Sequence, residues 1–136
     1  WLVIGFTGEA SSTGKMVAEV AQRLKDEPRL EAEMDAIARI TRAGLTALSA
    51  GNKEAVGMAM DACHQKLRLI GVSSPSLEAL VEAVEPHALG AKLTGAGGGG
   101  CMIALAREPQ RVAEAIEIAG GRPLISKLGA SGVHLL

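Results

Sequence analysis

The chain has 136 residues, 48% of them hydrophobic and 21% charged, a balance typical of one globular domain with a core of its own. Its formal net charge of −1 argues against a broad electrostatic hold on nucleic acid. No apolar run approaches the ~18 residues of a membrane span, and no signal peptide is visible. Two cysteines, Cys63 and Cys101, match no metal-binding spacing, so we expect reduced thiols in a cytoplasmic protein.

The first half of the chain predicts one strand followed by three helices. Either Ser12 or Thr13 caps the first helix, Pro28 suits the first turn of the second, and Asn52 caps the third. Gly51 ends the second helix. These signals and the apolar spacing predict a strand over 1–6 and helices over about 13–25, 28–49 and 53–70.

The second half of the chain mixes short helices with strands. Ser74 before a proline is a helix start, and an apolar run follows each of the later turns. The predicted elements are a helix over about 75–84, strands over 91–94 and 101–106, a helix over 109–119, and candidate closing strands over 122–127 and 133–136. Because strands and helices do not alternate as regular βαβ units, the pattern predicts an α+β fold with helices packed on a mostly antiparallel sheet.

A glycine run lies between two of the predicted strands. Residues 92–101 read KLTGAGGGGC, in which five of the ten residues are glycine. Glycine loses more backbone entropy on folding than any other residue, so such a run weakens the element that contains it. Consecutive glycines also expose backbone N–H groups and allow a phosphate or another backbone to come close. The run is therefore either a ligand-binding loop or a tight crossing between two strands.

Two familiar nucleotide motifs do not fit the sequence. The run contains the spacing G-x-G-x-x-G, but a dinucleotide site opens a helix, whereas the strand-like segment 101–105 follows here. Gly14 and Lys15 suggest a phosphate loop, but their spacing from Gly8 is one residue too long. Met16 also stands where a serine or threonine would hold magnesium.

KLTGAGGGGC resembles the third conserved motif of the GHMP kinases, a family of small-molecule kinases. Residues 4–13 (IGFTGEASST) and 69–75 (LIGVSSP) are similar to stretches of the same family, in the same order and at matching spacing. Within the family, the archaeal type of the mevalonate kinase branch is most similar. The resemblance implies a ferredoxin-like variant with a four-stranded sheet, and implies that residues 1–136 are the family's C-terminal domain alone.

The resemblance also implies a reaction: transfer of the ATP γ-phosphoryl group to the primary hydroxyl of mevalonate in isoprenoid precursor synthesis, with Mg²⁺ neutralising the phosphates. In this family the ATP-binding loop, a catalytic aspartate and a lysine belong to an N-terminal domain, which also holds most of the ATP and Mg²⁺ contacts. We therefore expect this chain to be inactive alone and to need that domain as partner. An uncovered docking face would favour self-association, including a homodimer.

Two alternatives remain open. Phosphomevalonate kinase and homoserine kinase share the fold and the third motif, so the acceptor is not determined by the resemblance. A non-catalytic small-molecule-binding module of the same fold is the second alternative, and the missing catalytic half favours it.

The third motif lies at the domain junction in this family, against the ATP-binding loop and the acceptor. Thr13 falls on a family position near mevalonate, where its hydroxyl would orient the acceptor, and Ala96 is also implied to be substrate-adjacent. No catalytic residue and no metal ligand is expected on this chain. The residues implied to lie beside the ATP phosphate loop are Gly95, Ala96, Gly97, Gly98, Gly99 and Gly100.

Several other residues carry weaker expectations. Phe6 and Cys63 depart from the family pattern, in which many members have aspartate and asparagine at those positions. We expect His64 to be a surface or core-edge residue, Cys101 to be an inert core residue, and Lys92 to be a solvated strand lysine.

Overall fold

The computed structural model describes residues 1–132 of the chain. Between them lie four strands, five α-helices and one short 3₁₀ helix, η1 (Pro28–Leu30). The predicted strand over 133–136 lies outside the described residues. In chain order the other elements are β1 (Leu2–Phe6), α1 (Thr13–Asp26), α2 (Glu31–Ser49), α3 (Lys53–Ile70), α4 (Pro75–Val84), β2 (Gly90–Thr94), β3 (Cys101–Leu105), α5 (Pro109–Ile118) and β4 (Arg122–Ser126).

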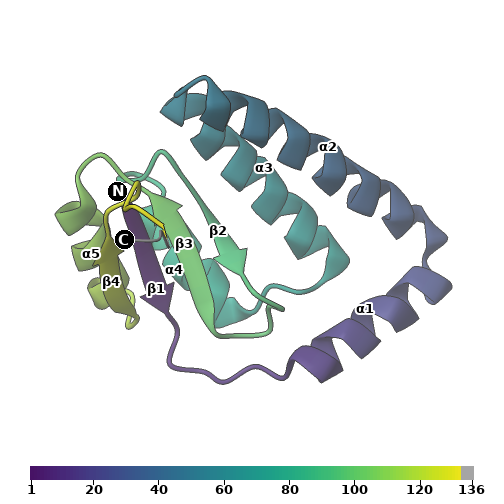
Figure 1. Cartoon of the computed structure of the whole chain (residues 1–136). Coiled ribbons are helices and arrows are strands. Elements are labelled where there is room, and N and C mark those ends of the chain that lie inside the picture. The colour runs from purple at the N-terminus through teal and green to yellow at the C-terminus, as the bar shows by residue number, and fades with distance from the viewer. Residues whose placement is uncertain (133–136) are drawn as a thin grey trace.

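The four strands form one antiparallel sheet in the order β2-β3-β1-β4. With α1, α2 and α3 set aside as an insertion, the chain runs β1-α4-β2-β3-α5-β4, which is the ferredoxin-like arrangement. The predicted α+β class and four-stranded antiparallel sheet are therefore confirmed. The insertion leaves the sheet after β1 and returns at the start of α4 (Figure 1).

Helix boundaries follow the polar residues at their ends. The Ser12 hydroxyl accepts a hydrogen bond from the N–H of Lys15 at 3.4 Å, so Ser12 is the cap and Thr13 is the first helical residue. Asn52 accepts from the N–H of Ala55 at 3.0 Å in the same way. The second predicted helix starts differently, because Pro28 opens the 3₁₀ turn η1 and α2 begins only after it.

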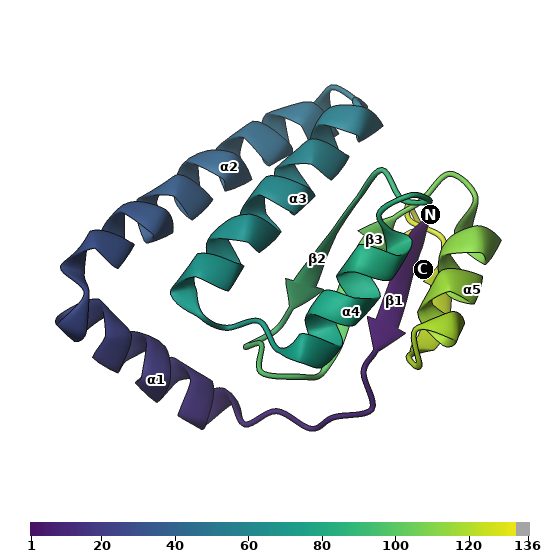
Figure 2. The ribbon, with the colours of Figure 1, turned by 180° about the vertical axis from the view of Figure 1, so that it is seen from behind.

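The core lies on one face of the sheet, under α4 and α5. Val3 on β1 and Met102 on β3 are fully buried there against residues of the two helices, among them Leu77 and Ile116. Figure 2 views the sheet from the side that these two helices cover. Burial of this aliphatic set is the main source of the fold's stability, since the chain has almost no aromatic residues.

The opposite face of the sheet faces the viewer in Figure 1 and is not covered by a described helix. Ile4 and Phe6 of β1 are only half-buried there, and Leu124 of β4 is 62% exposed. The α2–α3 hairpin stands beside the β2 edge rather than over this face (Figure 1). Residues 1–132 hold no helix with the length and apolar character needed to cross a membrane.

Candidate functional site

The glycine loop over residues 95–100 joins β2 to β3 in a conformation that requires glycine. Its backbone torsion φ is +80° at Gly95, +83° at Gly97, +70° at Gly98, +133° at Gly99 and +77° at Gly100. At each of these positions, an L-amino acid other than glycine would lower the stability of the fold by about 1–2 kcal/mol. The run is therefore a specific backbone shape that other residue types would adopt only at a cost in stability.

The loop is held on one side by the segment between β1 and α1. The N–H of Gly100 donates to the carbonyl oxygen of Glu9 at 3.0 Å, and the N–H of Thr7 donates to the carbonyl oxygen of Gly100 at 2.9 Å. The Thr7 hydroxyl donates to the same Gly100 oxygen, and the Ser11 hydroxyl donates to the carbonyl oxygen of Gly97. Residues 7–11 thus fix the loop along much of its length.

On its other side the loop is held by the turn before α4. The N–H of Gly98 donates to the carbonyl oxygen of Val72 at 2.8 Å. A β-carbon built on Gly97 would lie 2.0 Å from that same oxygen, so the two backbones are in direct contact. The Glu9 carboxylate accepts from the Ser76 hydroxyl at 2.7 Å and ties the two supporting segments together. The three separate stretches of sequence that resemble one family therefore meet at one place in the fold.

Some amides of the loop donate to no described residue. The N–H groups of Gly95, Ala96 and Gly99 make no hydrogen bond with any residue in the range 1–132; Gly95 is exposed and Ala96 half-buried, whereas Gly99 is buried against Glu9. A β-carbon added to Gly95 or to Gly100 would meet no atom within 4 Å, so open space lies beside both residues. Free amides on a loop without bulky side chains suit an anionic oxygen such as that of a phosphate.

Thr13 lies at the start of α1, next to the loop but not bonded to it. A β-carbon on Gly98 would fall 2.5 Å from the Met16 sulfur, so the first turns of α1 pack on the loop. The Thr13 side chain is exposed, and its hydroxyl makes no hydrogen bond with a described residue. The first turn of α1 holds no acidic residue, so its free N–H groups face no competing carboxylate of that turn.

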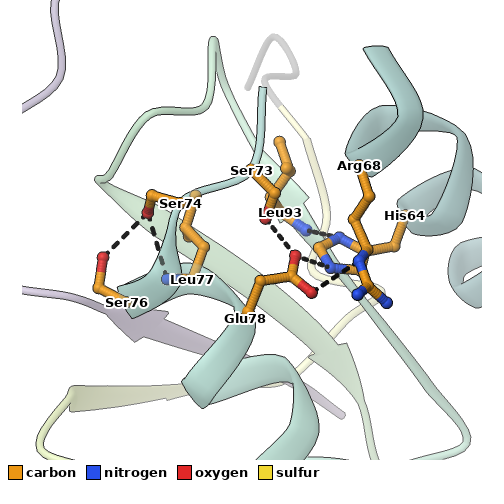
Figure 3. A network of polar contacts seen from close by, with 8 residues as sticks. All are labelled: His64, Arg68, Ser73, Ser74, Ser76, Leu77, Glu78 and Leu93. Atoms are coloured by element: carbon orange, nitrogen blue, oxygen red, sulfur yellow. Dashed lines mark hydrogen bonds and ion pairs between the residues drawn. The ribbon is translucent and has the colours of Figure 1, made fainter. Parts of the chain in front are cut away.

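His64 lies at the centre of a buried polar network that could not be expected from the sequence. Its ring is only 4% exposed, and its Nδ1 accepts from the N–H of Leu93 at 3.2 Å. Its Nε2 lies 3.0 Å from the Glu78 carboxylate, which also accepts from Arg68 Nε at 2.8 Å and from the Ser73 hydroxyl (Figure 3). The expectation of a surface or core-edge residue is therefore wrong, because the ring is buried and its polar atoms are satisfied by Leu93 and Glu78. Nothing in its local spacing indicated its partners.

Burial is the dominant influence on His64. It lowers the pKa of the imidazole below its ordinary value, and the nearby Glu78 carboxylate offsets this only in part. The ring is therefore neutral near pH 7. Because Nδ1 accepts from Leu93, the proton of the neutral ring is on Nε2 and is donated to Glu78.

The remaining residues singled out from the sequence lie outside the glycine loop. Lys92 is half-buried, and its Nζ donates to the carbonyl oxygen of Leu93 at 2.7 Å rather than pointing freely into solvent. Cys101 is half-buried instead of being in the core, because it lies on the sheet face that α4 and α5 do not cover. Cys63 is also half-buried, and both thiols are free. The guanidinium of Arg122 lies 4.8 Å from the centre of the Phe6 ring, a cation–π contact.

The sheet and the glycine loop together indicate the class of domain to which this chain belongs. A ferredoxin-like sheet presents a side-chain-free loop at one end, and the polar groups around that loop bind its backbone. At its open side the loop therefore presents mainly backbone atoms.

Comparison with known proteins gives that class a family. Residues 45–122 match the model of the C-terminal domain of GHMP kinases, and the chain belongs to this family. A mevalonate kinase of Thermococcus sibiricus is 41% identical over 98% of this chain and 43% of its own length. A mevalonate kinase of Pyrococcus furiosus is 41% identical over 98% of this chain and 42% of its own length. The chain thus spans less than half the length of these relatives.

Solved structures agree with the family. The crystal structure of Leishmania major mevalonate kinase in complex with R-mevalonate has a TM-score of 0.79 at 34% identity, covering 87% of this chain and 36% of that one. The Methanococcus jannaschii mevalonate kinase has a TM-score of 0.71 at 28% identity, covering 90% of this chain and 38% of that one. A phosphomevalonate kinase of Streptococcus pneumoniae, with a TM-score of 0.77 at 23% identity, shares the fold.

Proposed function

We propose that residues 1–136 are the C-terminal domain of an ATP-dependent mevalonate kinase. The enzyme transfers the γ-phosphoryl group of ATP to the primary hydroxyl of mevalonate, a step toward isoprenoid precursors. The observation that carries the proposal is the meeting of the segments 7–11, 72–76 and 95–100 around one glycine loop. The identity of about 41% to archaeal mevalonate kinases over nearly the whole chain supports the acceptor.

In this proposal the glycine loop forms one wall of the reaction site. Gly95, Ala96, Gly97, Gly98, Gly99 and Gly100 lie beside the ATP phosphates, with Ala96 also close to the acceptor. A wall without side chains lets two reactants approach in line, and phosphoryl transfer depends mainly on such positioning and on charge stabilisation. The free N–H groups of Gly95 and Ala96 are donors for oxygens that become more negative during transfer.

Thr13 orients the acceptor in the same proposal. Its hydroxyl is exposed, has no partner among residues 1–132, and lies at the end of a helix that packs on the loop through Met16. A hydroxyl can both donate to and accept from the hydroxyl and carboxylate groups of mevalonate. The two exposed features, the loop amides and this hydroxyl, belong to one site.

ATP fits the loop because free amides and open space occur together there. Among the described residues, no three His, Cys, Asp or Glu side chains come together in a way that could hold a metal ion. Following the family resemblance, we assign the Mg²⁺ contacts, the ATP-binding loop and the catalytic aspartate and lysine to an N-terminal domain. The chain alone is expected to have no kinase activity.

The uncovered sheet face supports docking of that N-terminal domain. Leu124 is 62% exposed on β4, and Leu48 is 63% exposed on the neighbouring hairpin. Between hairpin and sheet lies a groove of about 790 Å³ with Trp1, Val56 and Leu105 in its lining. Exposed apolar surface of this kind marks an interaction site, and it would drive self-association, as a homodimer or larger species, when the partner is missing.

The proposed reaction and the two free thiols both bear on where in the cell the protein is located. Both cysteines are free in the structure, which suits a reducing environment. We propose a cytoplasmic location.

The acceptor is tested by complementation. This chain is mixed with a separately expressed N-terminal domain of an archaeal mevalonate kinase, and ADP release is followed with ATP, Mg²⁺ and one acceptor at a time: mevalonate, phosphomevalonate or homoserine. The proposal predicts ADP release with mevalonate only. Release with another acceptor would assign the chain to that sister enzyme, and associated halves without any release would favour a non-catalytic module.

A further inference from the structure

Glu78 on α4 reaches the glycine loop by two routes. In the first, its carboxylate accepts from His64 Nε2, and His64 Nδ1 in turn accepts from the N–H of Leu93, two residues before Gly95. The imidazole thus bridges α4 to the strand that leads into the loop.

The second route runs through the turn before α4. The Ser73 hydroxyl donates to the same Glu78 oxygen that His64 contacts. Ser73 directly follows Val72, whose carbonyl oxygen accepts the N–H of Gly98 in the middle of the loop. One carboxylate therefore connects to both the entry strand and the middle of the loop (Figure 3).

We propose that His64 and Glu78 are positioning residues that act as a two-point clamp on the glycine loop, with the neutral imidazole as its working state. The clamp holds the backbone at Leu93 and at Gly98, so that the intervening amides of Gly95 and Ala96 keep a fixed direction. Its effect on phosphoryl transfer rests on the proposed function, but the clamp itself is a property of this chain.

The arrangement depends on the protonation of the ring. A second proton would have to sit on Nδ1, directly opposite the N–H of Leu93, and would replace an acceptor by a donor. The charged groups that face the ring are Glu78 from α4, Arg68 and Asp61 from α3, and Lys92 from β2. Burial of the ring supports the neutral form, so the clamp remains closed throughout the neutral range.

The position of β2 at the edge of the sheet explains why the clamp binds this strand. β2 is an edge strand, and its outward N–H groups at Ala91 and Leu93 are bound by Asp61 and His64 from α3. Asp61 and His64 are three residues apart, so both lie on the same side of α3. Asp61 binds only the N–H of Ala91, whereas His64 binds the N–H of Leu93 and also contacts Glu78.

The test uses nuclear magnetic resonance on this chain, without any catalytic readout. In the wild type we expect the His64 ring nitrogens to show the tautomer with the proton on Nε2. Glu78→Ala is expected to change that tautomer balance and to speed amide exchange at both Leu93 and Gly98 by roughly tenfold or more, because a charge-assisted buried network is lost. Arg68→Ala is the matched control: Arg68 binds the same carboxylate but is 54% exposed, so its exchange effect is expected to stay within about threefold.

A milder variant separates the two routes and guards against a variant that fails to fold. Ser73→Ala is expected to speed exchange at Gly98 while leaving Leu93 and the tautomer unchanged. The clamp is overturned if the Nε2 proton is absent in the wild type, or if Glu78→Ala folds with wild-type exchange at Leu93 and Gly98. Wild-type exchange at Gly98 in Ser73→Ala would overturn the second route. Because these measurements need no catalysis, they test the clamp whether or not the complementation assay succeeds.

Discussion

The backbone of Gly97 touches the backbone of Val72 so closely that a β-carbon on Gly97 would lie 2.0 Å from the Val72 carbonyl oxygen. The two backbones therefore leave no room for a side chain on residue 97. The glycine loop and the turn before α4 are therefore packed directly against each other, and the shape of the proposed site depends on glycine at this position.

Substitution of two glycines with similar torsions separates the effect of contact from that of torsion. Gly97→Ala combines a positive φ of +83° with the clash against Val72, so we expect a loss of about 3 kcal/mol or more in unfolding free energy. Gly95→Ala has φ of +80° but no atom within 4 Å of the added carbon, and a loss of about 1 kcal/mol is expected. Urea unfolding of both variants measures the difference. Equal losses would show that the Val72 contact is not tight.

A second close approach fixes α3 against the sheet. A β-carbon on Gly57 would lie 2.0 Å from the carbonyl oxygen of Leu89, just before β2. Gly57→Ala is therefore expected to destabilise the fold by about 2 kcal/mol or more, although alanine is the better helix former. Gly44→Ala on α2 is the control, because its added carbon meets Ala59 at an ordinary 3.4 Å. A gain of about 0.5–1 kcal/mol is expected there, measured by urea unfolding. A gain at Gly57 as well would contradict the packing of α3 on β2.

Asp61 gives a pH-dependent prediction. Burial raises the pKa of its carboxyl above the ordinary value of 3.8, the Glu85 carboxylate adds to this, and the hydrogen bond from the N–H of Ala91 opposes it. A raised pKa in the fold means that this group contributes stability at low pH, and that the contribution is lost as pH rises through the folded-state pKa. Ionised Asp61 is thus slightly unfavourable at pH 7.

Asp61→Asn removes the charge and keeps an oxygen for the N–H of Ala91. We expect its stability at pH 7 to equal or exceed that of the wild type, by less than about 1 kcal/mol because the carboxyl is only partly buried and the residue remains exposed to solvent, with the advantage disappearing below the ordinary carboxyl pKa. Asp61→Ala removes the acceptor as well and is expected to lose about 1 kcal/mol. Unfolding curves at several pH values test both. An asparagine variant as unstable as the alanine variant would contradict this account.

Thr13 and Ser12 are neighbours with different predicted roles. Thr13→Ala is expected to leave the unfolding free energy within about 0.5 kcal/mol of the wild type, because the side chain is exposed and unbonded among the described residues. In the complemented kinase it is expected to raise the KM for mevalonate about tenfold through the lost hydroxyl. Ser12→Ala removes the cap of α1 and is expected to cost about 1 kcal/mol with a smaller change in KM. An unchanged KM in Thr13→Ala would remove Thr13 from the site.

Local chemistry explains which parts of the fold could be predicted from the sequence. Ser74 and Asn52 have side chains that cap helices through neighbouring N–H groups, so their role depends on residues close in sequence. The ambiguity between Ser12 and Thr13 could not be resolved, because either hydroxyl can make the same bond. The half-buried position of Cys101 also escaped prediction, because an apolar strand does not reveal that one face of its sheet lacks a helix.

The candidate site was predictable as a set of segments but not as a set of contacts. The glycine run indicates an unusual backbone, and the resemblance linked it to the other two stretches. The Ser11–Gly97 and Thr7–Gly100 bonds, however, join residues far apart in sequence, as does the His64–Leu93 bond. Short polar side chains after a strand are the available signal for the first two, since they often bond to backbone, but their partners depend on the tertiary fold.

Whether the glycine loop forms part of the kinase site is measured by mevalonate-dependent ADP release from the complemented enzyme that carries Ala96→Leu. Ala79→Leu, an exposed position on α4, is the control. We expect release by the wild type and by Ala79→Leu, and a loss of about a hundredfold or more for Ala96→Leu at unchanged thermal stability, because the larger side chain would enter the proposed space between phosphate and acceptor. Wild-type release by a folded Ala96→Leu would contradict the claim that this loop is a wall of the kinase site.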